Sequence, residues 1–66
     1  MPYITMECGE LTKEQKNKLI EKITQDASEI TNIPSEFFIM TIKELSDENI
    51  GLGGMTIDVI KSGYKK

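Results

Sequence analysis

The chain opens with Met1-Pro2-Tyr3-Ile4-Thr5-Met6-Glu7-Cys8, in which apolar and more polar side chains alternate. An alternation with a period of two predicts a β-strand with two unequal faces. Pro2 suits the first residue of a strand, where no ladder donor is needed. If Met1 is removed, Pro2 carries a free secondary amine that can act as a base. If Met1 stays, the same nitrogen is an amide and offers no lone pair.

A helix is predicted to follow this strand. Gly9 ends the strand, and Thr12-Lys13-Glu14-Gln15 matches the capping box that begins many helices. We expect a helix from Lys13 to Ile30 or Thr31, ended by Asn32 and Pro34. Its apolar side chains recur at helical spacing and form one stripe: Leu19, Ile20, Ile23, Ala27 and Ile30.

The run from Phe37 to Glu44 is the strongest strand signal in the chain, and it is apolar on both faces. Phe37 and Ile39 share one face. The other face and the helix are predicted to form the protomer core from Leu19, Ile20, Ile23, Phe38, Met40 and Ile42. A strand, a helix and a strand joined by short links predict a right-handed parallel β-α-β unit. One helix covers only one face of the sheet, so the second face favours cover by another subunit.

The C-terminal third is predicted to form a short β-hairpin. A polar loop, 45–49, precedes Ile50-Gly51-Leu52-Gly53-Gly54-Met55, whose glycines indicate tight turning. Residues 56–60 are expected to complete the hairpin or arm, with no helix beginning after the glycines. The tail, 61–66, is expected to be mobile.

Length and composition indicate one domain, 1–66, that is marginal as a monomer. Cys8 is the only cysteine, so no intrachain disulfide is possible, and the absence of histidine argues against a metal site. We therefore expect a homo-oligomer, a hexamer first and a dimer next. The single thiol and the lack of a signal peptide or long apolar run predict a reduced, cytoplasmic setting without membrane association.

The charge argues against nucleic acid as a partner. The formal net charge is −3, and all eight basic residues are lysine. A mildly acidic chain without a basic patch lacks the electrostatic footprint that nucleic-acid binding needs. The lack of arginine also matters for small acids, because arginine is the usual bidentate clamp for a carboxylate.

Several pieces, in this order, resemble the 4-oxalocrotonate tautomerase family. They are Met1-Pro2-Tyr3-Ile4, Leu11-Thr12-Lys13-Glu14-Gln15-Lys16, Pro34, Glu44 and Ile50-Gly51-Leu52-Gly53-Gly54. The resemblance covers essentially the whole chain and suggests a small, DmpI-like member of the superfamily that also includes macrophage migration inhibitory factor. It implies an α+β fold in which β-α-β protomers with a C-terminal hairpin pair into dimers, and the dimers form a hexamer.

The resemblance also implies the site. Pro2 falls on the family's amino-terminal proline, which acts as the general base without any cofactor. The arginines that the family uses to bind substrate fall on Leu11 and Ile39, and its pocket aromatic falls on Ile50. Lys43 shares a strand face with Ile39, so it is a candidate for the missing positive charge, and the alternative is a solvated lysine at the strand end.

Two functions remain open at this point. The first is a keto–enol tautomerase, an isomerase acting on a small 2-oxo or enol acid or carbonyl compound and weak on dicarboxylates. The second is a non-enzymatic oligomeric module that keeps the fold and has lost the substrate clamp. Cys8 is predicted to be a small buried hydrophobe. Glu7, Glu44 and Asp58 are candidate acid or base partners, and the alternative is that they are ordinary surface carboxylates.

Overall fold

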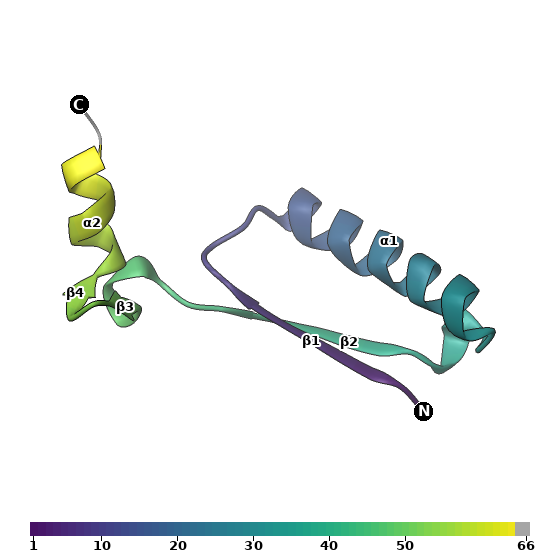
Figure 1. The fold of residues 1–66 in the computed structure, drawn as a ribbon. Coiled ribbons are helices and arrows are strands. Elements are labelled where there is room, and N and C mark those ends of the chain that lie inside the picture. Colours follow the sequence, from purple (N-terminus) through teal and green to yellow (C-terminus); the bar gives the residue numbers. More distant parts are fainter. Residues whose placement is uncertain (65–66) are drawn as a thin grey trace.

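A computed structural model of the 66-residue chain describes residues 1–64. Strands β1 (Tyr3–Cys8) and β2 (Ile39–Glu44) form a parallel two-stranded sheet, and helix α1 (Lys13–Thr31) connects them along one face of it (Figure 1). The predicted β-α-β unit is confirmed. Beyond β2 the chain continues into a small separate group of elements that extends away from the sheet (Figure 1).

Helix α1 has the predicted bounds because both of its ends are capped. The Gln15 N–H donates to Thr12 Oγ1 (3.1 Å), and the Thr12 N–H donates to Gln15 Oε1 (2.9 Å), which completes the capping box. At the other end Asn32 adopts a left-handed conformation (φ 62°), and its N–H donates to the Ser28 carbonyl oxygen (2.9 Å).

The sheet register fixes which side chains face the helix. Tyr3 lies opposite Ile39, and Cys8 lies opposite Glu44. Burial alternates along both strands. The half-buried residues, which face α1, are Pro2, Ile4, Met6 and Cys8 with Phe38, Met40 and Ile42. The opposite face of the sheet is open, and it carries Tyr3, Thr5, Glu7, Phe37, Ile39, Thr41 and Lys43.

The helix face differs from the predicted stripe at two residues. Leu19, Ile23 and Ala27 are half-buried, whereas Ile20 is 39% exposed and Ile30 is 81% exposed. The first three residues lie at i, i+4 and i+8, which keeps them on one line along the helix. Ile20 lies about 100° around the helix from Leu19. Ile30, seven residues after Ile23, stays on the same side of the helix, but it lies in the last turn and is exposed there. The predicted core is therefore wrong at Ile20, and the predicted stripe is also wrong at Ile30.

Strand β2 begins two residues later than predicted. After Pro34, residues Ser35–Phe37 form a 3₁₀ turn (η1), in which the Phe37 N–H donates to the Pro34 carbonyl oxygen (3.0 Å). The Phe38 N–H donates to the Ser35 carbonyl oxygen (3.0 Å), so the ladder starts only at Ile39. The faces of Phe37 and Phe38 are nevertheless as predicted, because Phe37 is exposed and Phe38 is half-buried.

The chain beyond β2 forms an arm, 47–64, made of a second 3₁₀ turn η2 (Asp47–Asn49), strands β3 (Gly51–Leu52) and β4 (Met55–Thr56), and helix α2 (Ile57–Tyr64). The predicted hairpin is confirmed, but each strand has only two residues. Its turn is Gly53-Gly54, with φ values of 63° and 87°. Two successive positive φ angles are what a two-residue hairpin turn needs, and glycine adopts them without strain.

Helix α2 corrects three expectations. Residues 57–60 do not extend the hairpin, residues 61–64 are helical, and a helix does begin after the glycines; Lys65 and Lys66 lie outside the described residues. The Ile57 N–H donates to the Ile50 carbonyl oxygen (2.8 Å), and Lys61 Nζ forms an ion pair with Asp47 Oδ2 (2.8 Å). These contacts hold α2 on η2 and on the hairpin. The half-buried Ile57 and Ile60 have helical spacing, but a run this short is ambiguous from sequence.

The protomer leaves much apolar surface uncovered. Of residues 1–63, whose burial the structure describes, none is fully buried. The molecule is elongated, with extents of 45 × 22 × 17 Å. The arm exposes Leu52, Met55 and Val59, and the open sheet face exposes Tyr3, Phe37 and Ile39. Within residues 1–64, neither helix is long and apolar enough to cross a membrane.

Candidate functional site

Pro2 lies immediately before β1, on the side of the sheet that faces α1, and is half-buried; the strand begins at Tyr3, one residue later than predicted. The Ile39 N–H donates to the Pro2 carbonyl oxygen (3.0 Å), so the first backbone bond between the strands holds this residue. The bond uses the oxygen of Pro2 and leaves its nitrogen outside the ladder. Met1, which precedes it, is largely exposed.

The five predicted site residues fall into two groups at opposite ends of the sheet. Ile39 lies beside Pro2 at one end. Lys43 lies four residues further along β2, which is about 13 Å along a strand. Leu11 is also at that far end, where its N–H donates to Glu44, and Ile50 lies beyond it in the arm. Figure 1 shows the N-terminus and the arm at opposite ends of the molecule.

Lys43 is on the open face of the sheet and is paired with a carboxylate. It lies opposite Glu7 in the register, and its Nζ is 3.9 Å from Glu7 Oε2. The two side chains are 64% and 61% exposed, so water screens the pair and it contributes about 0–1 kcal/mol at most. An exposed lysine of this kind can reorient toward an anion at little cost.

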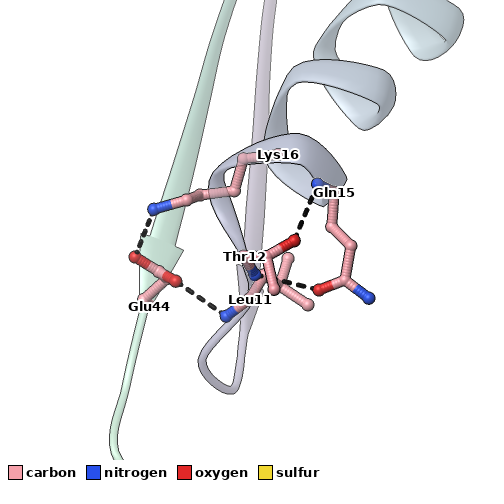
Figure 2. Close-up of polar contacts among 5 residues, drawn as sticks. All are labelled: Leu11, Thr12, Gln15, Lys16 and Glu44. Atoms are coloured by element: carbon pink, nitrogen blue, oxygen red, sulfur yellow. Dashed lines mark hydrogen bonds and ion pairs between the residues drawn. The ribbon is translucent and has the colours of Figure 1, made fainter.

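Glu44 forms the best-defined polar cluster of the β-α-β unit (Figure 2). Its Oε2 accepts from the Leu11 N–H (2.8 Å), and its Oε1 accepts from Lys16 Nζ (3.0 Å). The Leu11 hydrogen bond, followed by the hydrogen bond and charge of Lys16, lowers the pKa of Glu44 below its ordinary value of 4.5. The carboxylate at the end of β2 therefore fastens the loop before α1 and the first turn of α1 to the sheet.

Sequence reasoning did not find this cluster, because Glu44 resembled other surface carboxylates. The signal is available only once the strands are known to be parallel. The end of β1, the start of α1 and the end of β2 then meet at one edge of the sheet. Lys16, in the turn after the Thr12 cap, is only half-buried and reaches that edge.

A groove runs along the first two turns of α1 on the other side of Leu11. It is lined by Leu11, Glu14, Gln15, Asn17, Lys18 and Leu19. Two of the lining side chains are leucines, and both are half-buried. Leu11 therefore has its backbone in the Glu44 cluster and its side chain at this groove.

Cys8 and Asp58, which were also considered from the sequence, lie away from Pro2. Cys8 is half-buried on the helix side of β1 and is not in a disulfide. Asp58 lies in the first turn of α2, where its Oδ1 accepts from the Val59 N–H (2.9 Å). Neither residue lies beside Pro2, because Cys8 is at the opposite end of β1 and Asp58 is in the arm.

A proline at the head of β1, a parallel β-α-β unit and a glycine hairpin beyond β2 define an α+β tautomerase fold. The family model described as tautomerase enzyme matches residues 2–60, and the chain belongs to this family. A probable tautomerase of Bacillus cereus is 42% identical over 55 residues, which cover 82% of this chain and 90% of the relative. The 2-hydroxymuconate tautomerase of Bacillus subtilis is 34% identical over 55 residues, which cover 82% and 89%.

The solved structures agree with the sequence relatives. A structure of the 4-oxalocrotonate tautomerase isozymes from Methylibium petroleiphilum superimposes with a TM-score of 0.82 at 32% sequence identity. The match covers 89% of this chain and 97% of that chain. The resemblance and fold class predicted from the sequence are confirmed, and the protein is an enzyme of the tautomerase class, an isomerase.

Proposed function

We propose that the protein is a cofactor-independent keto–enol tautomerase whose base is the amine of Pro2 after removal of Met1. The observation that carries this proposal is the position of Pro2. It is half-buried at the head of β1, held through its carbonyl oxygen by the Ile39 N–H, with its nitrogen outside the ladder. Partial burial disfavours the charged form of an amine, which leaves more of it neutral and able to accept a proton.

The proposed reaction moves one proton and needs no other reagent. The lone pair of the Pro2 nitrogen takes the proton from an enol oxygen, and the electrons of the O–H bond complete a C=O group. The electron pair of the former C=C bond then takes the proton back from Pro2 at carbon. In the reverse direction Pro2 removes the carbon proton first. A base that accepts and returns the same proton works best when its pKa lies near the operating pH.

We further propose that the working form is a homo-oligomer, a hexamer built from dimers as the resemblance implies. One protomer keeps Pro2 and Ile39 at one end of the sheet and Leu11, Lys43 and Ile50 at the other. A site containing all five residues therefore needs two or more copies. The exposed apolar residues of the open sheet face and of the arm support such contacts, because exposed apolar surface of this extent favours association.

The substrate in this proposal is a small 2-oxo or enol acid or a neutral carbonyl compound. The Bacillus subtilis relative is named for 2-hydroxymuconate, which is a dicarboxylate. Here Leu11 and Ile39 offer no charge for a second carboxylate, and Lys43 offers a point charge in place of a planar fork. The single thiol of Cys8 is compatible with the reduced, cytoplasmic setting that we predict.

The test compares processed and blocked protein on phenylenolpyruvate, a simple enol monoacid. Intact mass identifies the form in which Met1 has been removed, and the matched control keeps a residue ahead of Pro2, which turns the amine into an amide. We expect turnover in the processed form and only background rates in the blocked form, with the same oligomeric state in both. Equal rates above background in the two forms would exclude Pro2 as the base, and background rates in both forms would favour the non-enzymatic module.

A further inference from the structure

Glu44 accepts hydrogen bonds from two donors beside the groove that could otherwise bind a substrate carboxylate. One is the Leu11 N–H, which donates to Glu44 Oε2 (2.8 Å), and the other is the Lys16 ammonium, which donates to Glu44 Oε1 (3.0 Å). The carboxylate is ionised at neutral pH, because both contacts favour its charged form. A second carboxylate of a substrate would be repelled here by the negative charge of Glu44, and the positive charge of Lys16 is already balanced by its ion pair with Glu44.

The groove beside this cluster offers apolar contact. Leu11 and Leu19, which line the groove, are both half-buried. Lys16 lies three residues before Leu19, so the side chains of Lys16 and Leu19 are neighbours on the helix surface. The only charged side chains of the groove lining are Glu14 and Lys18. They lie at i and i+4, where opposite charges offset each other on a helix. The groove lining therefore has no net charge and includes two half-buried leucines.

We propose that Glu44 sets the substrate specificity of this end of the site, so that the groove beside Leu11 takes the apolar substituent of an enol monocarboxylate and not a second carboxylate. Glu44 is a positioning residue in this proposal: it acts through Lys16 and the Leu11 backbone. The inference rests on the proposed tautomerase function and on an assembly that brings this groove to the Pro2 of another copy.

The experiment measures kcat/KM of the processed protein on phenylenolpyruvate and on 2-hydroxymuconate. The unaltered protein should favour phenylenolpyruvate. Glu44→Gln removes the charge but keeps an amide oxygen that can still accept from the Leu11 N–H. Because the Lys16 ammonium is then free, the kcat/KM for 2-hydroxymuconate should rise about tenfold, mainly through a lower KM. High salt should reduce this gain, since it depends on a free cation.

Three further variants separate the effect of the Glu44 charge from an effect on folding. Lys16→Gln leaves the Glu44 charge uncompensated and should lower turnover of 2-hydroxymuconate below that of the unaltered protein. The double variant Glu44→Gln with Lys16→Gln should lose the rise in kcat/KM that Glu44→Gln alone produces. Asp26→Asn is the matched control, because it removes one carboxylate charge from an exposed position of α1 away from the groove. It should leave the ratio of the two kcat/KM values unchanged.

The outcomes distinguish this inference from the proposed function. Turnover of phenylenolpyruvate with no change of the ratio in Glu44→Gln overturns the specificity role of Glu44 and leaves Pro2 as the base. Equal kcat/KM on both substrates in the unaltered protein would likewise overturn the specificity role of Glu44 and leave Pro2 as the base. If Glu44→Gln does not assemble, unchanged or increased 2-hydroxymuconate turnover in Lys16→Gln overturns the inference. Absence of turnover on either substrate by the processed, assembled protein overturns the proposed function, and this inference with it.

Discussion

At the scale of the residue, Pro2 and Glu44 show how different surroundings give different roles. Pro2 has a half-buried ring and a backbone oxygen that is already bonded, and our proposal assigns the base to its nitrogen after removal of Met1. Glu44 has both carboxylate oxygens engaged, which makes it a clamp between β2 and the start of α1. Its charge state therefore affects how firmly the helix is held to the sheet.

The Glu44 clamp predicts a pH dependence of stability. Its pKa is lower in the folded protein than its ordinary value of 4.5, so the folded state favours the ionised form. Its stabilising contribution is fully present above pH 4.5 and is lost as the pH falls through the lower folded pKa. Denaturant midpoints measured at a series of acidic pH values should fall less steeply for Glu44→Gln than for the unaltered protein.

The control for this titration is Glu36→Gln, which removes an exposed carboxylate from the 3₁₀ turn before β2. It should leave the acid slope close to that of the unaltered protein. An identical slope for Glu44→Gln and the unaltered protein would show that the clamp does not form in solution.

At the scale of the element, α1 shows that position along a helix matters as well as hydrophobicity. Leu19, Ile23 and Ala27 are half-buried, whereas Ile30, on the same side but in the last turn, is mostly exposed. The cost of truncating an apolar side chain depends on how much of it the fold removes from water. Two isoleucines of the same helix therefore provide a matched comparison.

We expect Ile23→Ala to lower the free energy of unfolding by about 2 kcal/mol, the low end of the range for truncating a core isoleucine, because Ile23 is half-buried in the protomer. Ile30→Ala should cost about 0.5 kcal/mol or less. Equilibrium unfolding at one fixed protomer concentration measures both values. A larger cost for Ile30→Ala than for Ile23→Ala would show that a partner subunit covers Ile30 in solution.

The arm provides a second matched pair, in two glycines that have free space around them. A Cβ at Gly54 or at Gly63 would meet no atom within 4 Å. Gly54 has a φ of 87° in the hairpin turn, so Gly54→Ala should cost about 1–2 kcal/mol through backbone strain alone. Gly63 lies within α2, so Gly63→Ala should stabilise the arm by about 0.5–1 kcal/mol. Hydrogen exchange of the α2 amides reports both changes.

At the scale of the whole molecule, the protomer is incomplete. Among residues 1–63 no side chain is fully buried, the sheet has one open face, and the arm exposes Leu52, Met55 and Val59. A chain of 66 residues gains little stability from a core of this kind. Contact with further copies would cover these surfaces.

We therefore expect sedimentation at low micromolar concentration to show a stable oligomer. Leu52→Glu introduces a charge at an exposed apolar position of the arm and should shift the distribution toward smaller species, with a matching loss of turnover. Gln25→Glu, which adds the same charge on the exposed side of α1, should leave the distribution unchanged. A folded, stable monomer of the unaltered protein would contradict both the assembly and a site shared between subunits.

The sequence by itself determined the elements whose signals are local. The Thr12 capping box, the alternation of β1 and the glycine pair of the hairpin are patterns of two to seven residues. The capping box and the glycine pair act through short-range hydrogen bonds and backbone preferences, and the alternation indicates which side chains of β1 are buried. Together with the resemblance, they were enough to predict the α+β tautomerase fold, which the structural relatives confirm.

The tertiary structure alone decided where the site residues lie. Glu44 reaches Leu11 and Lys16 across 33 and 28 residues, contacts that no local pattern encodes. The same is true of the separation of Pro2 from Lys43 and of helix α2, whose short apolar pattern is ambiguous from the sequence and which contacts Ile50 and Asp47 in the fold. Contacts between distant residues depend on how the elements pack, and in this protein that packing also separates the predicted site residues within one chain.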